Sequence, residues 1–183
     1  MRPTFAQALA VLGERVPKQT VNVEVKYPSN VNGTIGQRYW SRQTVLEETL
    51  RALDRTGVPA YFSSFDPVTV LLLHYGQNKY PVFYLNDGYA NGPAPPDGLR
   101  YLSVVHDISK GIDFAAQHGL QGLVVSLTIV RNFMDQLKRA ISMGLKVCSW
   151  GTIPGDETGL EARQREAGME VLLYDLVHLA SWK

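Results

Sequence analysis

The sequence predicts an α/β protein with a parallel β-sheet, and three observations lead to this prediction. Short apolar segments of strand type alternate with helical segments along the whole chain. Most of these strands are apolar throughout, which is typical of parallel strands buried between helices. Several helical segments end at a glycine, the residue that most often follows the last turn of a helix.

The first half of the chain contains three of the expected strands. The expected elements are a helix at 3–13 that Thr4 can cap, a strand at 21–26, a polar loop from 29 to about 41, a helix at 43–56 that ends at Gly57, a short strand at 60–63, a helix at 67–75 and a strand at 81–85. Asp66 and Pro67 have the form of an N-cap followed by proline in the first turn, which predicts the start of the helix at 67.

The second half continues the same alternation after a loop at 88–98. The expected elements are a helix at 101–118, a strand at 123–126, a helix at 129–143, a strand at 146–150, a helix at 156–167, a strand at 171–174 and a short helix at the C-terminus. The glycines at 119, 144 and 168 mark the ends of the three longer helices. The chain therefore reads as about six strands, each followed by a helix or a helical turn.

The segment 21–26 differs from the other strands because it alternates strictly. In a strand, its three valines face one side and Asn22, Glu24 and Lys26 face the other. A carboxylate beside an ammonium group at the carboxyl end of a barrel strand suits a metal ion and an anionic substrate. The same pattern also fits an edge strand with one solvated face, and the segment alone does not decide between the two.

Composition limits the classes of function. A chain of 183 residues is long enough for one domain with a substantial core, and a net charge of +1 gives no general reason to expect binding to nucleic acid or a membrane surface. No apolar run approaches the length of a membrane span, and the first residues do not resemble a signal peptide. Cys148 is the single cysteine, so we expect a reducing compartment and a cytoplasmic protein.

Two architectures fit this order of elements, an open doubly wound sheet and a barrel of the (β/α)8 type. The glycine-rich first turn of many nucleotide-binding open sheets is missing from the sequence. A barrel needs eight βα units and typically about 250 residues. With 183 residues and six units, either the sheet is open or two units are missing.

Five motifs, in this order and spacing, resemble the glycerophosphodiester phosphodiesterase family, and most closely its eukaryotic glycerophosphocholine-cleaving branch. They are Asn22-Val23-Glu24-Val25-Lys26-Tyr27-Pro28, Phe62-Ser63-Ser64-Phe65-Asp66-Pro67, Asn78-Lys79-Tyr80-Pro81-Val82-Phe83-Tyr84-Leu85, Cys148-Ser149-Trp150, and the segment from Glu166 to Asp175. The resemblance covers nearly the whole chain. Each motif alone is only weak evidence for the family, but five motifs in this order and spacing are specific evidence.

The resemblance implies a TIM barrel in which the motifs occupy strands three to eight. Residues 1–183 would then be one family domain without its first two βα units, an incomplete barrel made of the C-terminal three quarters of the fold. Those first units carry the family's His-Arg-Gly motif, its Glu-x-Asp metal ligands and its His-Asp motif. The resemblance therefore implies that both catalytic histidines are absent and that this chain alone is inactive.

The activity implied by the resemblance is the hydrolysis of glycerophosphodiesters, such as glycerophosphocholine, to glycerol phosphate and an alcohol. The cofactor would be a divalent cation, Mg²⁺ or Ca²⁺, with Glu24 as one carboxylate ligand. Lys26 would hold a phosphate oxygen, and Trp150 would stack on the glycerol or on a choline head group. The alternatives are that Glu24 and Lys26 satisfy each other and that Trp150 only packs the end of the barrel.

Other polar residues have structural interpretations. Asp66 is expected to be a helix cap rather than a catalytic group, and Ser126 is a weak candidate for lining the site. His106-Asp107 imitates the family's His-Asp pair, but it falls within the predicted helix at 101–118, at the wrong point in the order. We therefore expect a surface or interhelical histidine there.

Two further functions stay open at this stage. The chain could be a non-catalytic barrel domain that binds a phosphodiester or a protein partner. It could also be a different barrel enzyme in which Lys26 forms a Schiff base with a carbonyl substrate. The sequence does not distinguish the head group of the substrate or the oligomeric state.

Overall fold

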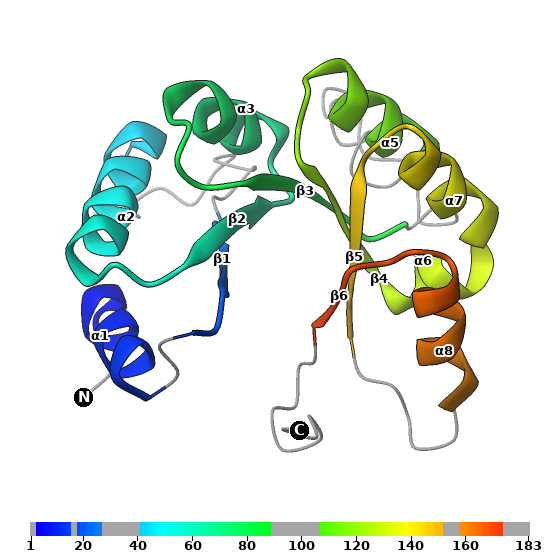
Figure 1. Ribbon diagram of the computed structural model, residues 1–183. Coiled ribbons are helices and arrows are strands. Elements are labelled where there is room, and N and C mark those ends of the chain that lie inside the picture. Colours follow the sequence, from blue (N-terminus) through cyan, green and yellow to red (C-terminus); the bar gives the residue numbers. More distant parts are fainter. Residues whose placement is uncertain (1–2, 16–17, 27–40, 89–106, 152–157, 174–183) are drawn as a thin grey trace, which may run out of the picture. The chain divides into compact units, whose positions relative to one another are not determined.

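The computed structural model describes residues 3–15, 18–26, 41–88, 107–151 and 158–173 (Figure 1). The chain divides into two compact units, residues 1–82 and 83–183, and each unit is described by itself. Strands and helices alternate along both units, as the sequence predicts.

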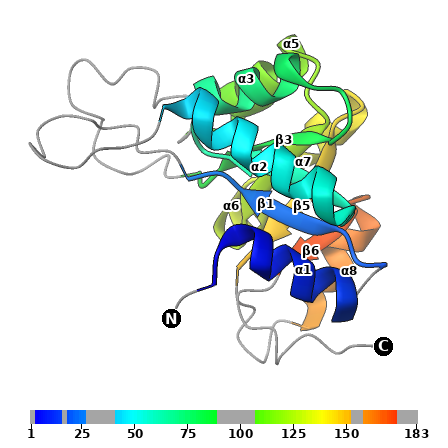
Figure 2. The same cartoon turned by 90° about the vertical axis from the view of Figure 1, so that its left-hand side faces the viewer.

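The first unit contains two strands and three helices. They follow in the order α1 (Phe5–Arg15), β1 (Val21–Glu24), α2 (Arg42–Thr56), β2 (Ala60–Ser64) and α3 (Pro67–Gly76). The strands β1 and β2 are parallel, with Val21 opposite Ala60 and Glu24 opposite Ser63. The three helices lie on one side of the two strands, and α1 packs against α2 (Figures 1 and 2).

The helices of this unit begin and end where the sequence places capping residues. The Gln7 backbone N–H donates to Thr4 Oγ1 at 3.3 Å, and the Thr4 N–H donates to Gln7 Oε1 at 2.8 Å, so Thr4 caps α1 as predicted. Gly57 has φ 65°, a left-handed conformation, and its N–H donates to the Leu53 carbonyl at 2.9 Å. This bond closes the last turn of α2, and it confirms the predicted end of that helix.

The core of the first unit is apolar and contains side chains from every element. Leu9, Leu53, Phe62, Val70 and Leu73 are almost completely buried. Each is a residue that the helical or strand pattern places on the inner face of its element. Burial of this apolar surface stabilises the packing of the three helices on β1 and β2.

The second unit continues the alternation. Its elements are β3 (Val82–Asn86, whose first residue belongs to the first unit), α5 (Ile108–Gln117), β4 (Gly122–Ser126), α6 (Leu127–Asn132), α7 (Met134–Ser142), β5 (Lys146–Trp150), α8 (Thr158–Glu166) and β6 (Val171–Leu173). The strands pair in chain order from β3 to β6, and each of these pairs is parallel. The predicted parallel α/β class is therefore confirmed.

Two predicted helices differ from the structure. The single helix expected at 129–143 is two helices, because the backbone at Phe133 leaves the helical region with φ −134° and ψ 32°. The helix expected at 101–118 begins at Ile108, where the Asp107 side chain accepts hydrogen bonds from the N–H groups of Ser109 and Lys110. Residues 101–106 and the short C-terminal helix lie outside the described residues.

A candidate polar site on the first strand

The strand β1 has one buried face and one polar face, as its alternation predicts. Val23 and Val25 are buried, whereas the Lys26 and Glu24 side chains are 79% and 31% exposed. The Val25 N–H donates to the Ser63 carbonyl at 2.8 Å, so the pairing with β2 continues one residue past Glu24. The charged face is accessible to solvent, and the valines of the other face belong to the apolar core.

Glu24 and Lys26 form an ion pair, with Lys26 Nζ 3.5 Å from Glu24 Oε2. The predicted self-pairing of the two residues therefore exists. Among the described strands β1 is bonded to β2 alone, which also matches the alternative of an edge strand. An exposed ion pair of this kind contributes about 0–1 kcal/mol to stability, so it holds the two groups together only weakly.

Asn22 and Ser63 add uncharged polar groups to the same face. The Ser63 hydroxyl donates to Asn22 Oδ1 at 2.8 Å, and Ser63 is fully buried opposite Glu24 in the strand register. Alternation along β1 places the Asn22 side chain on the side of Glu24. No role for Asn22 is predicted from the sequence, although the alternation along β1 is the signal that points to one.

Ser64 bonds to the backbone, whereas Ser63 bonds to a side chain. Its hydroxyl donates to the Val25 carbonyl at 2.7 Å, and it accepts a hydrogen bond from the Asp66 N–H at 3.1 Å. These bonds connect the end of β1 to the turn between β2 and α3. Ser64 is therefore a structural residue that fixes the carboxyl ends of the two strands.

Asp66 caps α3, as the sequence predicts. The carboxylate accepts hydrogen bonds from the Val68 and Thr69 N–H groups and, at 2.6 Å, from the Thr69 hydroxyl. Arg42 Nε at the start of α2 lies 2.8 Å from Asp66 Oδ2. Asp66 is almost fully buried among these partners, in the capping position that the sequence predicts.

Trp150 lies in the second unit, at the last residue of β5. Its side chain is half-buried, and it stands opposite Ser126 in the register between β4 and β5. The Ser126 hydroxyl donates to the Asp87 carbonyl at 3.0 Å, so it orders the chain after β3. The predicted position of Trp150 at the carboxyl end of a strand is confirmed, but its contact with a ligand stays a prediction.

The histidines of the described residues take structural positions. His74 makes an edge-on ring contact with Tyr75, and His118 lies against Phe114 at the end of α5, with ring centroids 4.9 and 4.8 Å apart. Asp107 is the N-cap of α5. His106 itself lies outside the described residues.

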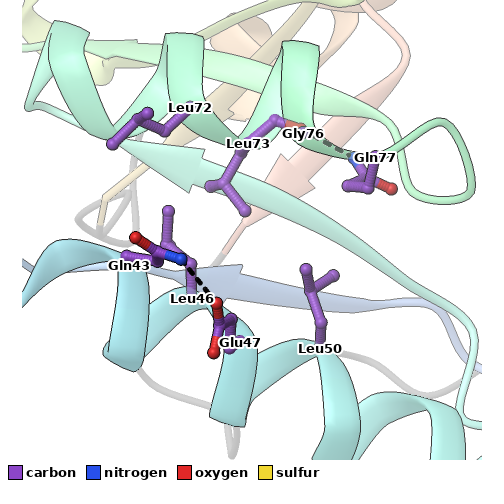
Figure 3. Close-up of a pocket in the computed structure, with 8 residues that line it drawn as sticks. All are labelled: Gln43, Leu46, Glu47, Leu50, Leu72, Leu73, Gly76 and Gln77. Carbon is purple, nitrogen blue, oxygen red and sulfur yellow. Dashed lines mark hydrogen bonds between the residues drawn. The ribbon is translucent and has the colours of Figure 1, made fainter.

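A groove of about 310 Å³ lies on the helix side of the first unit, between α2 and α3 (Figure 3). It is lined by Gln43, Leu46, Glu47, Leu50, Leu72, Leu73, Gly76 and Gln77. Its Gln43 amide donates to the Glu47 carboxylate at 2.8 Å. The groove is apolar with a polar rim, and it contains none of the predicted site residues.

Known proteins resemble this chain in sequence and in structure. No family model matches the chain. Over 161 residues the chain is 26% identical to Glycerophosphodiester phosphodiesterase GDPD3 of Arabidopsis thaliana. The matched region covers 85% of this chain and 40% of that protein.

Solved structures with the same fold cover almost all of the chain. A phosphodiesterase of Oleispira antarctica in complex with the product sn-glycerol-3-phosphate matches with a TM-score of 0.62 and 15% identity, over 94% of this chain and 57% of that one. A glycerophosphodiester phosphodiesterase of Parabacteroides distasonis matches with a TM-score of 0.60 and 14% identity, over 95% of this chain and 60% of that one. The resemblance to the glycerophosphodiester phosphodiesterase family is confirmed.

The match to solved glycerophosphodiester phosphodiesterases also confirms the predicted fold, an incomplete (β/α)8 arrangement. The chain spans 40% of the length of its Arabidopsis relative and 57–60% of these two solved structures. Within the residues that the structure describes, no helix has the length and apolar character needed to cross a bilayer.

The metal ion implied by the resemblance to glycerophosphodiester phosphodiesterases can be tested against the side chains present. The described residues contain no group of three His, Cys, Asp or Glu side chains that could hold an ion. Glu24 stands on the polar face as a single carboxylate with Lys26 beside it, whereas Mg²⁺ and Ca²⁺ take about six or more oxygen ligands. These residues alone therefore do not fit a divalent cation.

Proposed function

We propose that this chain is part of a glycerophosphodiester phosphodiesterase domain, with glycerophosphodiesters such as glycerophosphocholine as substrates. In the reaction, a water oxygen bonds to phosphorus, the bond from phosphorus to the alcohol oxygen breaks, and that oxygen takes up a proton. The products are glycerol phosphate and the free alcohol. The observation that carries the proposal is the exposed Glu24–Lys26 pair on a strand that the resemblance aligns with the family's active-site strand.

The chemistry of the pair supports this assignment. Lys26 presents an ammonium group that is 79% exposed, and a point charge of this kind attracts a phosphate oxygen. Because the pair with Glu24 is weak and solvated, an anionic substrate can compete for Lys26 at little cost. Glu24 would be the carboxylate that this face contributes to a divalent cation.

A divalent cation, Mg²⁺ or Ca²⁺, belongs to the proposal only together with ligands beyond the described residues. Trp150 is proposed as a stacking surface for the glycerol or for a choline head group, because a quaternary ammonium ion is attracted to the face of an indole ring. Its place at the end of β5 supports this role.

A second candidate is a binding domain without catalytic activity. The observation that favours it is the polar face of β1, which offers Glu24 as its single carboxylate, while the described residues contain no cluster for a metal ion. A domain of this kind would keep Lys26 for phosphate binding and would not need a general acid or base. The two candidates differ in turnover and not in ligand binding.

The first prediction concerns turnover. We expect that the polypeptide of 183 residues, purified alone, does not release choline or glycerol phosphate from glycerophosphocholine with Mg²⁺ or Ca²⁺. General acid–base catalysis is worth roughly 10²–10⁴ in rate, and the two described histidines that could supply it lie in or at the end of a helix, His74 in α3 and His118 after α5. The assay is release over time, with a chelator as the blank.

A chimera completes this test. The segment that carries His-Arg-Gly, Glu-x-Asp and His-Asp in a related phosphodiesterase is joined upstream of Met1, which we expect to restore turnover. In the chimera, Glu24→Gln should abolish metal-dependent activity at nearly constant shape, and Lys26→Ala should weaken it. Metal-dependent release by the 183-residue polypeptide that is lost in Glu24→Gln would show that other residues complete the site. A chimera without turnover that still binds the substrate would favour the non-catalytic binding domain.

A further inference from the structure

We propose that Asn22 recognises a hydroxyl group of the glycerol moiety and that Ser63 is the residue that positions it. The inference rests on the proposed function, since it names a specificity determinant of the same polar face. Three observations carry it: the orientation of the Asn22 amide, the order of side chains along β1, and the burial of Ser63.

The orientation of the Asn22 amide follows from its hydrogen bond. Ser63 Oγ donates to Asn22 Oδ1 at 2.8 Å, so the oxygen end of the amide is held against β2. The other end, the Nδ2 amino group, carries two N–H donors. No other hydrogen bond of this side chain occurs among the described residues, and the side chain is half-buried, so these donors are available to a ligand on the polar face.

The order of side chains along the strand sets the geometry of recognition. Residues two apart on a strand project from the same face about 6.6 Å apart, which places Asn22 one step from Glu24. The Lys26 ammonium reaches back to within 3.5 Å of the Glu24 carboxylate. The Asn22 amide and the Lys26 ammonium group therefore lie on either side of Glu24 along the polar face of β1. A small phosphate ester whose anionic end lies at Lys26 would bring its hydroxyl groups towards Asn22.

Ser63 is suited to fix the orientation of the Asn22 amide because its own side chain is held in the core. Its side chain is fully buried and stands opposite Glu24 in the register. A buried hydroxyl must keep a partner, and Asn22 Oδ1 is the acceptor that it uses. Without the Ser63 hydroxyl, the amide of Asn22 loses the bond that selects its orientation.

Ser64 offers a matched control. It is also buried, it also donates one hydrogen bond across the strand pair, and it follows Ser63 directly. Its acceptor is the Val25 backbone carbonyl rather than a side chain. Loss of the Ser64 hydroxyl should therefore lower stability without any effect on ligand selectivity.

The test is titration calorimetry of the whole chain with two probes, sn-glycerol 3-phosphate and inorganic phosphate. Asn22→Ala and Asn22→Thr should each weaken binding of glycerol phosphate about fivefold, the value of one hydrogen bond, and leave the affinity for inorganic phosphate unchanged. Ser63→Ala should act in the same direction, and Ser63→Thr should restore binding. Ser64→Ala should change neither affinity, whereas Lys26→Ala should weaken both.

The outcomes separate this inference from the function on which it rests. If Lys26→Ala weakens both probes while Asn22→Ala matches the parent chain, the role of Asn22 is wrong and the proposed function stands. Equal losses for both probes in Asn22→Ala would also overturn the role, because they show a general effect on the strand. A parent chain that binds neither probe would overturn the inference together with the proposed function.

Discussion

Asp66 shows how one residue joins several parts of the first unit. Its carboxylate caps α3 and pairs with Arg42 at the start of α2, while its N–H is bonded to Ser64 at the end of β2. The group is buried with these partners, so its interactions are stronger than those of an exposed cap.

The second prediction compares two N-caps. Asp66→Ala should lower the free energy of unfolding by about 2–4 kcal/mol, because it removes the cap and leaves Arg42 without its buried carboxylate. Asp107→Ala, which removes the 44% exposed cap of α5, should cost only about 1 kcal/mol. Urea unfolding measures both, and equal losses would contradict the importance of burial at Asp66.

The third prediction concerns Cys148, which is buried in β5. Burial raises the pKa of the Cys148 thiol from 9.0 to about 12, so the native chain contains very little thiolate at pH 8. Reaction with a disulfide reagent should therefore be on the order of 10²–10³ times slower in the native chain than in urea. Fast reaction of the native chain would show that the strand is open to solvent.

The same shift gives a pH dependence of stability. Since the folded pKa of Cys148 is higher than the unfolded value, the contribution of the neutral thiol is fully present below pH 9. It decreases as the pH rises from 9 towards about 12. Thermal unfolding of the chain and of Cys148→Ala over this range should show a difference that narrows with rising pH.

Part of the site could be predicted from single residues. The alternation of β1 correctly separated Glu24 and Lys26 from the valines, and the Asp-Pro pair correctly marked a cap. The bond between Ser63 and Asn22 could not be predicted, because it connects residues 41 positions apart in sequence and depends on the register between two strands. Side-chain partners across a sheet become visible only when that register is known.

At the scale of elements, the loop from α3 to β3 depends on one side chain. Gln77 Nε2 donates to the carbonyls of Leu73 and Tyr80, at 3.2 and 2.8 Å. Its Oε1 accepts the N–H groups of Lys79 and Tyr80, at 2.9 and 2.7 Å. One amide therefore makes hydrogen bonds with four backbone groups around this loop.

The fourth prediction follows from this count of bonds. Gln77→Ala should lower the free energy of unfolding by about 2 kcal/mol, because several backbone groups lose their partners. Asn78→Ala is the matched control, since Asn78 is an exposed neighbour in the same loop and should change little. Similar midpoints of thermal unfolding for the two variants would contradict the role of Gln77.

Helix ends were predicted better than helix interruptions. Thr4, Gly57 and Asp66 each carry a local signal for the start or end of a helix, and the structure confirms all three. The break at Phe133 carries no such signal, because neither glycine nor proline is present and apolar residues continue on both sides. The interruption depends on how α6 and α7 pack, which a helical pattern does not contain.

At the scale of the whole molecule, the alternation of strands and helices predicts a parallel α/β fold, but it does not distinguish an open sheet from a barrel. Alternating buried strands and helices occur in open sheets and in barrels alike, because the difference lies in strand tilt and stagger. The order of the five motifs favours the barrel, and the solved structures that match 94–95% of the chain agree with that prediction. The chain spans 40% of the length of one relative and 57–60% of the other two, so phosphodiesterase activity stays a proposal for this chain.

The most direct test of the proposed site is a titration of the ¹⁵N-labelled chain with sn-glycerol 3-phosphate, followed by two-dimensional amide spectra. We expect the largest shifts at Asn22, Glu24, Lys26 and Ser63, and we expect them to disappear in Lys26→Ala. Shifts confined to the groove between α2 and α3, around Leu46, Leu50 and Leu72, would contradict the account. They would place the binding surface on the helix side and leave the polar face of β1 as a solvated edge.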